Sequence, residues 1–540
     1  MRLSRDICLG GHWNNRYVLG IKYVDHDRNG HIIYLKTDGV YNAYTVDGGS
    51  FEIINDDNLY SMHLSPYLEP GDGRIIKEER DSCSYSENGT YKAIMSGRIK
   101  APNSSVLEIK SIRRDTIDLS YFCGGFGASD TPYGFTNLKS FEFEAEDFPT
   151  NPTTTYRMFL GCESLEKVTI GCENDSLLGA NEMFYGCSKL VDVNLRNFKT
   201  ANIKSMAFMF LNCSSLETLD LSSWNTGNVV HIAGMFEGCT NLKNLNLSNW
   251  NTANVTDMTG VFEDCQSLAT LDVSHFNTEN TKNFNAMFNG CSSLISLDVT
   301  NFNTSKATDI GWMVGGCSSL LSLDLSQFNT SKVENMSGVF NGCSSLREIK
   351  GLASFNASKV LHTKWMFEGC IGLTSLDLSH FNTTVWSAEG MFKGCYNLKQ
   401  LDISNLIIIA PAHDSGVQAM FSGCSSLETL DLSKLTIPNA TSIAEMFKDC
   451  SSLKILNLSN LQCEPYYVDD LFTGCNALQE LRLDNCPYDT IRILISKLPK
   501  HTKPDDITHC IYCKQSNTRS SDGTYLTPPT GWKFEYVPEQ

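Results

Sequence analysis

Residues 320–343 read Leu-Leu-Ser-Leu-Asp-Leu-Ser-Gln-Phe-Asn-Thr-Ser-Lys-Val-Glu-Asn-Met-Ser-Gly-Val-Phe-Asn-Gly-Cys, and close variants of this stretch recur along most of the chain. A cysteine ends each copy, and the six steps from Cys187 to Cys343 are 26 residues each. The thirteen ladder cysteines are Cys162, Cys187, Cys213, Cys239, Cys265, Cys291, Cys317, Cys343, Cys370, Cys395, Cys424, Cys450 and Cys475. A fixed period of about 20–29 residues is typical of leucine-rich-repeat solenoids, so the chain is predicted to form a stack of similar coils.

The first half of each copy predicts a β-strand. In the copy that starts after residue 213, Leu216, Leu219 and Leu221 follow the leucine pattern of a repeat strand. Because side chains alternate along a strand, Leu219 and Leu221 are expected in the core, and Asp220 and Ser222 on the opposite face.

The second half of each copy predicts a short helical segment. Thr226 is a suitable N-cap. Val229, Ile232, Met235 and Phe236 follow it with the spacing of one helical face.

The residue before each ladder cysteine predicts a left-handed backbone that ends the helical segment. It is glycine in ten copies, at positions 161, 186, 238, 290, 316, 342, 369, 394, 423 and 474. In the other three copies it is Asn212, Asp264 or Asp449. These residue types tolerate the left-handed conformation best, which favours a left-handed C-cap.

The predicted fold is therefore an α/β repeat solenoid of the leucine-rich-repeat type. It would form a horseshoe or arc with a parallel sheet on the concave face and short helical turns on the other side. Thirteen strands at about 4.8 Å would span roughly 60 Å. Each coil would bury its apolar face only against its neighbours.

The consensus Leu-Asp-Leu-Ser-x-Phe-Asn-Thr-x-x-Val-x-x-Met-x-x-Met-Phe-x-Gly-Cys-Ser-Ser-Leu resembles the BspA-type leucine-rich repeat of bacterial surface proteins. The resemblance covers about residues 138–485. It implies a cell-surface or extracellular protein that adheres to proteins, cells or other bacteria.

The predicted domains follow the limits of the repeat. Residues 1–115 are expected to form a small β-rich domain for docking or capping, with strands at Tyr17–Val24, His31–Lys36, Val40–Val46 and Phe51–Ile54 and a hairpin at Asn29-Gly30. Residues 116–157 would form an N-terminal cap and a degenerate first coil. Residues 158–485 would hold the thirteen repeats. Residues 486–540 would form a C-terminal cap with a helix at Ile491–Leu498 and a strand at Trp532–Val537.

Composition excludes some partners. The net charge is −18, and a field of this sign repels nucleic acid. Only 19% of residues are charged, so the surface is expected to be polar rather than strongly ionic. No apolar run of about 18 residues exists, so no membrane span is expected. The first twelve residues lack the apolar run of a signal peptide.

The cysteines favour buried free thiols over disulfides or metal sites. An odd-numbered column of equivalent cysteines cannot pair completely, and a buried thiol packs as a small hydrophobe. Cys510 and Cys513, with His501 and His509 nearby, match half of a zinc site, but no second Cys-x-x-Cys exists. Residues 25–30 match the start of a calcium loop without its closing acid, and a hairpin turn fits them better. No metal or cofactor is expected.

The candidate binding surface is a strip on the concave face. Its acidic column contains Asp220, Asp272, Asp298, Asp324, Asp377, Asp402 and Asp431, with Asn194, Asn246 and Asn457 at equivalent positions. Ser222, Ser274, Ser326, Ser379 and equivalent residues form a second column. These groups could bind sugar hydroxyls or basic side chains, with His275, His380, Gln327 and Arg196 adding specificity. The alternative is that Asp and Ser satisfy each other and solvate the sheet.

The leading hypothesis is a non-enzymatic adhesion or recognition protein that binds a protein or glycan on a cell surface. One alternative is a virion-associated protein, for example of a phage tail, that docks to its carrier particle through residues 1–115 and recognises a host with its repeats. The absent signal peptide motivates this alternative. A third hypothesis, an enzyme in one of the terminal segments, finds no catalytic constellation there.

Overall fold

The computed structural model of the chain describes residues 154–539 apart from 171–176, 382, 410–415, 436, 438–439, 464 and 501–508. It also describes residues 138–143 and the backbone of nine strands within residues 18–109. The chain divides into two compact units, residues 1–203 with 209–216 and residues 204–208 with 217–540. No helix among the described residues is long and apolar enough to span a membrane.

The first unit contains a ten-stranded sheet with the order β12-β11-β10-β9-β2-β1-β3-β8-β5-β6. Its strands are β1 (Val18–Lys22), β2 (Ile32–Thr37), β3 (Gly49–Ile54), β5 (Pro66–Pro70), β6 (Ile76–Lys77), β8 (Thr90–Met95), β9 (Val106–Ile109), β10 (Ser140–Phe143), β11 (Lys167–Ile170) and β12 (Asp192–Asn194). β4 (Tyr60–Met62) and β7 (Cys83–Tyr85) pair separately. β9 links an antiparallel part to a parallel part, because it pairs antiparallel with β2 and parallel with β10.

Three of the four predicted N-terminal strands coincide with β1, β2 and β3. β1 and β2 pair antiparallel, with Lys22 opposite Ile32, as the predicted hairpin requires. The turn at Asn29-Gly30 and the predicted strand Val40–Val46 lie outside the described residues.

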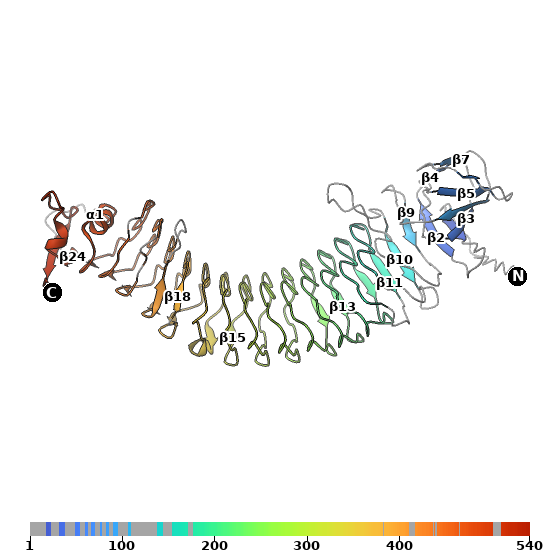
Figure 1. Cartoon of the computed structure of the whole chain (residues 1–540), viewed down its shortest axis with the longest axis horizontal. Coiled ribbons are helices and arrows are strands. Elements are labelled where there is room, and N and C mark those ends of the chain that lie inside the picture. Colours follow the sequence, from blue (N-terminus) through green and yellow to red (C-terminus); the bar gives the residue numbers. More distant parts are fainter. Residues whose placement is uncertain are drawn as a thin grey trace. The chain divides into compact units, whose positions relative to one another are not determined.

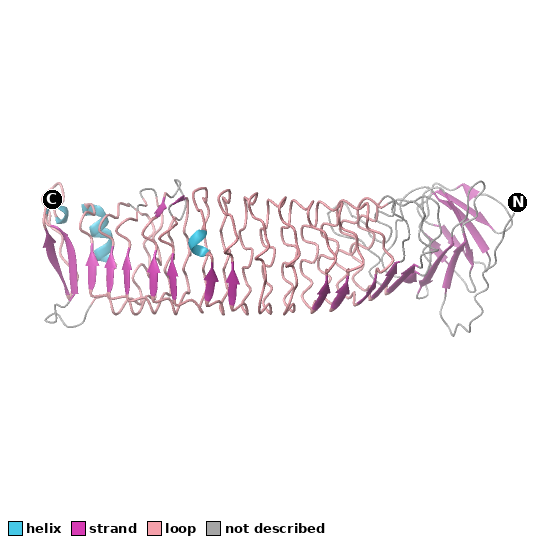
Figure 2. Ribbon diagram, turned by 90° about the horizontal axis from the view of Figure 1, so that it is seen from below, coloured by secondary structure: helices cyan, strands magenta, loops and turns pink. Residues whose placement is uncertain are grey.

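The second unit is a stack of parallel coils. Its strands are β13 (Thr218–Asp220), β14 (Asn244–Asn246), β15 (Ser322–Asp324), β16 (Glu348–Lys350), β17 (Ser375–Asp377), β18 (Thr383–Val385), β19 (Gln400–Asp402), β20 (Leu406–Ile408), β21 (Thr429–Asp431), β22 (Ile455–Asn457), β23 (Glu480–Arg482), β24 (His509–Lys514) and β25 (Trp532–Val537). Successive coils follow each other in sequence order (Figure 1), and most of these strands lie in one row (Figure 2). The predicted parallel-sheet solenoid is confirmed.

The strand half of the coil follows the leucine pattern. Leu219 and Leu221 are buried, while Thr218 and Asp220 are exposed. Leu219 lies opposite Leu245 of the next coil in a parallel register. We call the side that carries the exposed strand residues the strand face.

The prediction of a helical segment in the second half of each coil is wrong. The segment from Ile232 to Cys239 consists of consecutive tight turns, in which Met235 N donates to Ile232 O at 3.1 Å and Cys239 N to Phe236 O at 3.1 Å. Other N–H groups donate to the next coil instead, such as Phe236 N to Val261 O at 2.9 Å. A helix would need these donors within the segment, and so short a helix is costly to nucleate.

Two left-handed residues per coil explain why no helix forms. The residue before every ladder cysteine has positive φ, as predicted, including Asn212, Asp264 and Asp449. A second position, four residues earlier, is also left-handed in every coil: 157, 182, 208, 234, 260, 286, 312, 338, 365, 390, 419, 445 and 470. We call the surface around these two positions the turn face.

The ladder cysteines are buried free thiols, as predicted. The Cys265 thiol donates to Phe236 O at 3.2 Å and that of Cys291 to Phe262 O at 3.1 Å, each a backbone carbonyl of the preceding coil. Burial raises the pKa of the Cys265 and Cys291 thiols well above its usual range and that of Cys317 to about 12. The ladder therefore adds small apolar groups and weak links between coils.

We expect the ladder thiols of the folded chain to resist alkylation at about pH 8, because the thiolate is the reactive form and both burial and the raised pKa disfavour it. Iodoacetamide labelling mapped by mass spectrometry checks this. Cys510, which is partly exposed, serves as the internal control and should react first. Equal labelling of Cys291 and Cys510 in the native chain would contradict the expectation.

The solenoid sheet continues into the C-terminal segment. The helix α1 (Tyr488–Ser496) and the strand β25 agree with the predicted elements, but β24 was not predicted. β24 pairs in parallel with β23 and β25. On β24, Cys513 is buried with Ile511, whereas Cys510 is partly exposed, so these two thiols point to opposite faces and do not form the pair that a zinc site needs.

Candidate functional site

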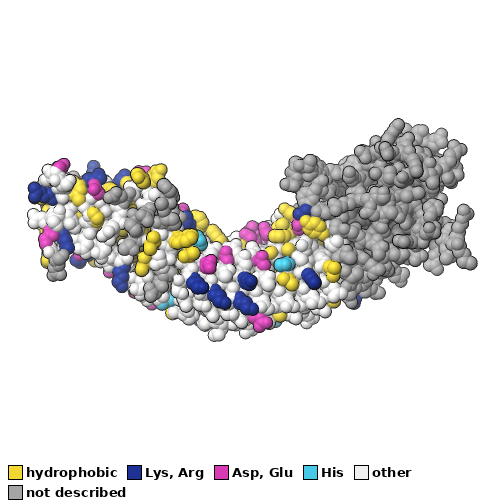
Figure 3. Space-filling model, viewed as in Figure 1, with side chains coloured by type: hydrophobic (Ala, Val, Ile, Leu, Met, Phe, Trp, Pro, Cys, Tyr) yellow, Lys and Arg dark blue, Asp and Glu magenta, His cyan; other side chains and the backbone are white. Residues whose placement is uncertain are grey.

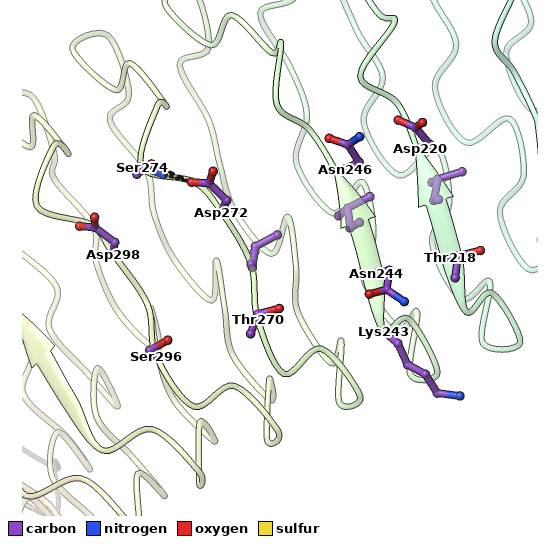
Figure 4. Close-up of a pocket in the computed structure, with 13 residues that line it drawn as sticks. Thr218, Asp220, Lys243, Asn244, Asn246, Thr270, Asp272, Ser274, Ser296 and Asp298 are labelled. Atoms are coloured by element: carbon purple, nitrogen blue, oxygen red, sulfur yellow. Dashed lines mark hydrogen bonds between the residues drawn. The ribbon is translucent and has the colours of Figure 1, made fainter.

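The strand face of the second unit carries two parallel rows of polar side chains over a shallow hollow of about 700 Å³. In Figure 4 one row contains Asp220, Asn246, Asp272 and Asp298, and the other contains Thr218, Asn244, Thr270 and Ser296. The rows arise because each strand exposes every second residue and the parallel register places equivalent residues side by side. The structure thus assembles Asp220, Asp272 and Asp298 on one surface.

Each aspartate of the acidic column also closes a turn at the end of its strand. Oδ1 of Asp272 accepts from the backbone N of Ser274 at 3.1 Å and from its Oγ at 2.7 Å. The same backbone bond, from the residue two positions later, is made to Asp220, Asp298, Asp324, Asp377, Asp402 and Asp431 at 2.9–3.1 Å. The column therefore has a structural role. These are the hydrogen bonds that the alternative interpretation, in which Asp and Ser satisfy each other, expects.

Three aspartates of the acidic column, Asp272, Asp324 and Asp377, are held in the ionised form at neutral pH. Hydrogen bonds from Ser274 hold the pKa of Asp272 below its usual range, and those from Ser326 and Ser379 do the same for Asp324 and Asp377. A carboxylate has lone pairs for several hydrogen bonds, so a turn bond to Oδ1 leaves further acceptor capacity toward solvent.

Two exposed apolar side chains stand at the start of their strand segments, one position before Ser296 and Ser322. Ile295 and Leu321 are adjacent, since Leu321 N donates to Ile295 O, and their side chains are about half exposed. Two coils before Ile295, Lys243 at the equivalent position is paired with Glu217 at 3.0 Å. Sequence reasoning missed this apolar strip, although its signal is visible as Ile295 and Leu321 at equivalent positions two residues before a buried leucine.

His275 and His380 hold structural positions at the edge of the strand face. Nε2 of His275 lies 3.0 Å from Leu247 O, a backbone carbonyl of the preceding coil, and its Nδ1 lies 4.0 Å from Asp272. Asn301 makes a similar link at the equivalent position, where its Nδ2 donates to Ser274 O at 2.9 Å. The ring of His380 packs edge-on against Phe381, and its Nε2 is buried with no hydrogen-bond partner in the described part of the chain.

The rest of the described surface is mostly polar and carries scattered charges. On the face that Figure 3 shows, charged side chains of the described coils are scattered among neutral ones. Within the described residues, no three or more His, Cys, Asp or Glu side chains are grouped to hold a metal ion. The arrangement is suited to binding an extended ligand through many weak contacts.

Comparisons with known proteins identify the repeat. Residues 130–221, 153–270, 209–322, 234–348, 308–408 and 413–483 match the model of a family described as "Mycoplasma protein of unknown function, DUF285". None of the curated proteins compared with the chain matches it.

Two solved structures are similar to part of the chain. A leucine-rich-repeat protein of Leptospira interrogans is 14% identical over 71% of this chain and 94% of its own, with a TM-score of 0.18. The mouse RP105/MD-1 complex is 16% identical over 74% of this chain and 71% of the matched chain, with a TM-score of 0.21. Likenesses this low carry no argument about function.

Proposed function

The chain belongs to the DUF285 family, and we propose that it is a non-enzymatic recognition protein of the cell surface or extracellular space that binds a protein or glycan on its strand face. Repeat solenoids of this type are typically binding proteins rather than enzymes. The observation that carries the proposal is the row of solvent-facing carboxylates that the parallel register places side by side. The candidate ligand-binding residues are Asp220, Asp272, Asp298, Asp324, Asp377, Asp402 and Asp431.

The charge of this face favours a protein ligand with basic side chains. Asp272 and Asp298 are exposed, and Ile295 and Leu321 provide exposed apolar area at the other end of their strand segments. Complementary charges steer encounter and fix register, whereas apolar contacts at the centre of an interface supply most of the affinity.

Replacing Asp272, Asp298 and Asp324 together with Asn is expected to raise the Kd for the ligand at least about tenfold without lowering the Tm. Asn is a matched substitution, because Oδ1 of the natural Asn246 accepts the same turn bond from Ser248 N at 3.2 Å. Binding of the full chain to immobilised extracellular-matrix proteins, serum proteins and glycans, measured by surface plasmon resonance at two salt concentrations, provides the test.

The same three positions changed to Ala form the control for structure. Ala cannot accept the turn bond, so this variant should lose both binding and thermal stability. If the triple Asn variant binds as tightly as the wild type, the carboxylates of the acidic column do not contribute to ligand binding. Binding that does not weaken with salt would argue against the basic partner.

A further inference from the structure

Trp312 and Trp365 occupy an unusual place on the turn face. Both stand at the first left-handed position of their coils, with φ values of 57° and 56°. A bulky side chain is strained there. Glycine fills the same position at residues 234, 260, 338 and 390, and among the seven other non-glycine residues at this position only Phe208 is aromatic. Strained residues that the fold does not require are candidates for a functional role.

Each tryptophan lies on a glycine of the next coil. A Cβ placed on Gly338 would come 2.5 Å from Cδ2 and Cε2 of Trp312, and a Cβ on Gly390 would come 2.6 Å from Cδ1 of Trp365. The two rings are 6.3 Å apart between centroids and inclined by 45°. Both are only partly buried. Glycine thus lets each ring lie against backbone while part of it faces solvent.

Planar polar side chains border the two rings. Asn289 and Trp312 both lie next to Gly315. A Cβ placed on Gly315 would come 2.8 Å from Asn289 Oδ1 and 3.0 Å from Trp312 Cε3. Beside Trp365, Lys364 pairs with Glu389 at 3.2 Å, and its Nζ lies 6.0 Å from the ring centroid.

The charges of this patch are balanced. The Lys364–Glu389 pair is matched by a second pair, Lys393 with Glu368 at 3.1 Å. Asn341 Nδ2 donates to Glu368 at 3.1 Å. The patch is therefore nearly neutral, in contrast to the acidic strand face.

We propose that Trp312 and Trp365 form the floor of a carbohydrate-binding site for a neutral sugar chain. The faces of the rings are electron-rich and suit the slightly positive C–H groups of a sugar ring. Amide, carboxylate and ammonium groups around them can donate to and accept from hydroxyls. A nearly neutral patch offers no charge complementarity to a basic or acidic partner. This site is on the turn face, so it does not depend on ligand binding by the strand face.

The test is affinity gel electrophoresis of the full chain in gels that contain dextran, hydroxyethylcellulose, laminarin, galactomannan or mannan. At least one polysaccharide should retard the wild type, and the W312G/W365G variant should lose at least about tenfold in affinity for it. Glycine is a conservative choice here, because it already occupies four equivalent left-handed positions. Tryptophan fluorescence of the wild type should shift on addition of the same polysaccharide.

Two controls separate this site from the strand face and from misfolding. The D272N/D298N/D324N variant should be retarded like the wild type. W312F/W365F keeps aromatic faces and should retain part of the affinity. No retardation of the wild type in any gel overturns the proposal, as does equal retardation of W312G/W365G. A patch that contacts protein instead would give the first of these results.

Discussion

Replacing Phe262 with Ala is expected to lower the free energy of unfolding by about 3–5 kcal/mol, the usual cost of removing a buried aromatic ring. Phe262 is fully buried. Its ring stacks on Phe236 at 5.7 Å and on Phe288 at 5.5 Å between centroids. The variant would therefore lose two ring contacts and leave a cavity between three coils. Chemical denaturation followed by circular dichroism measures the change.

The matched control is Phe208→Gly. Phe208 is 36% exposed and stands at a left-handed position that glycine tolerates, so its removal should change stability by about 1 kcal/mol or less. Because each coil is stabilised only by its neighbours, Phe262→Ala should also make unfolding less cooperative. Equal effects of the two substitutions would show that the phenylalanine stack is not the main support of the coils.

The strand half of the fold could be predicted from the sequence because burial alternates with every residue there. Leu219 and Asp220 point to opposite sides by geometry alone, and the period of the repeat fixes the register between coils. The other half could not be predicted in this way. Val229, Ile232, Met235 and Phe236 have the spacing of a helical face, but consecutive turns with the same residues buried give the same spacing.

The two left-handed positions of each coil determine that its second half is not helical, and only one of them could be recognised from the sequence. The position before each ladder cysteine is nearly always glycine, so its backbone could be inferred. The position four residues earlier contains Gly338 in one coil and Trp365 in the next, and so varied a column gives no sign of positive φ when each coil is considered alone. The pattern becomes visible only when neighbouring coils are compared. Where this position is aromatic, the same position of the next coil is glycine, as at 208 and 234, 312 and 338, and 365 and 390.

The candidate site was predicted only in outline. The acidic column lies on the strand face, as the strand alternation required. Its turn bonds to serine, however, depend on backbone geometry at the strand end. The tryptophan pair was missed because residues 312 and 365 fall in the segment that was interpreted as a helix.

Replacing Gly338 with Ala is expected to lower the free energy of unfolding by about 2–5 kcal/mol. The left-handed conformation of Gly338, with φ 61°, costs a non-glycine residue about 1–2 kcal/mol. The new methyl group would also overlap the ring of Trp312, and overpacking of this kind costs about 1–3 kcal/mol. The ring cannot move away easily, because it lies between Gly338 and the side of Trp365.

The two contributions can be separated with a double-mutant cycle. W312G removes the overlapping ring, so W312G/G338A should retain only the backbone strain and recover about 1–3 kcal/mol relative to the sum of the single changes. Gly260→Ala is the matched control: its φ is 59°, and its nearest neighbour is the flexible carboxylate of Glu263 at 3.0 Å. Gly260→Ala should lower the free energy of unfolding only by the backbone strain, about 1–2 kcal/mol. If G338A and G260A destabilise equally and W312G gives no recovery, the rings do not rest on the glycines, and the positions of the two half-buried tryptophans would need another explanation.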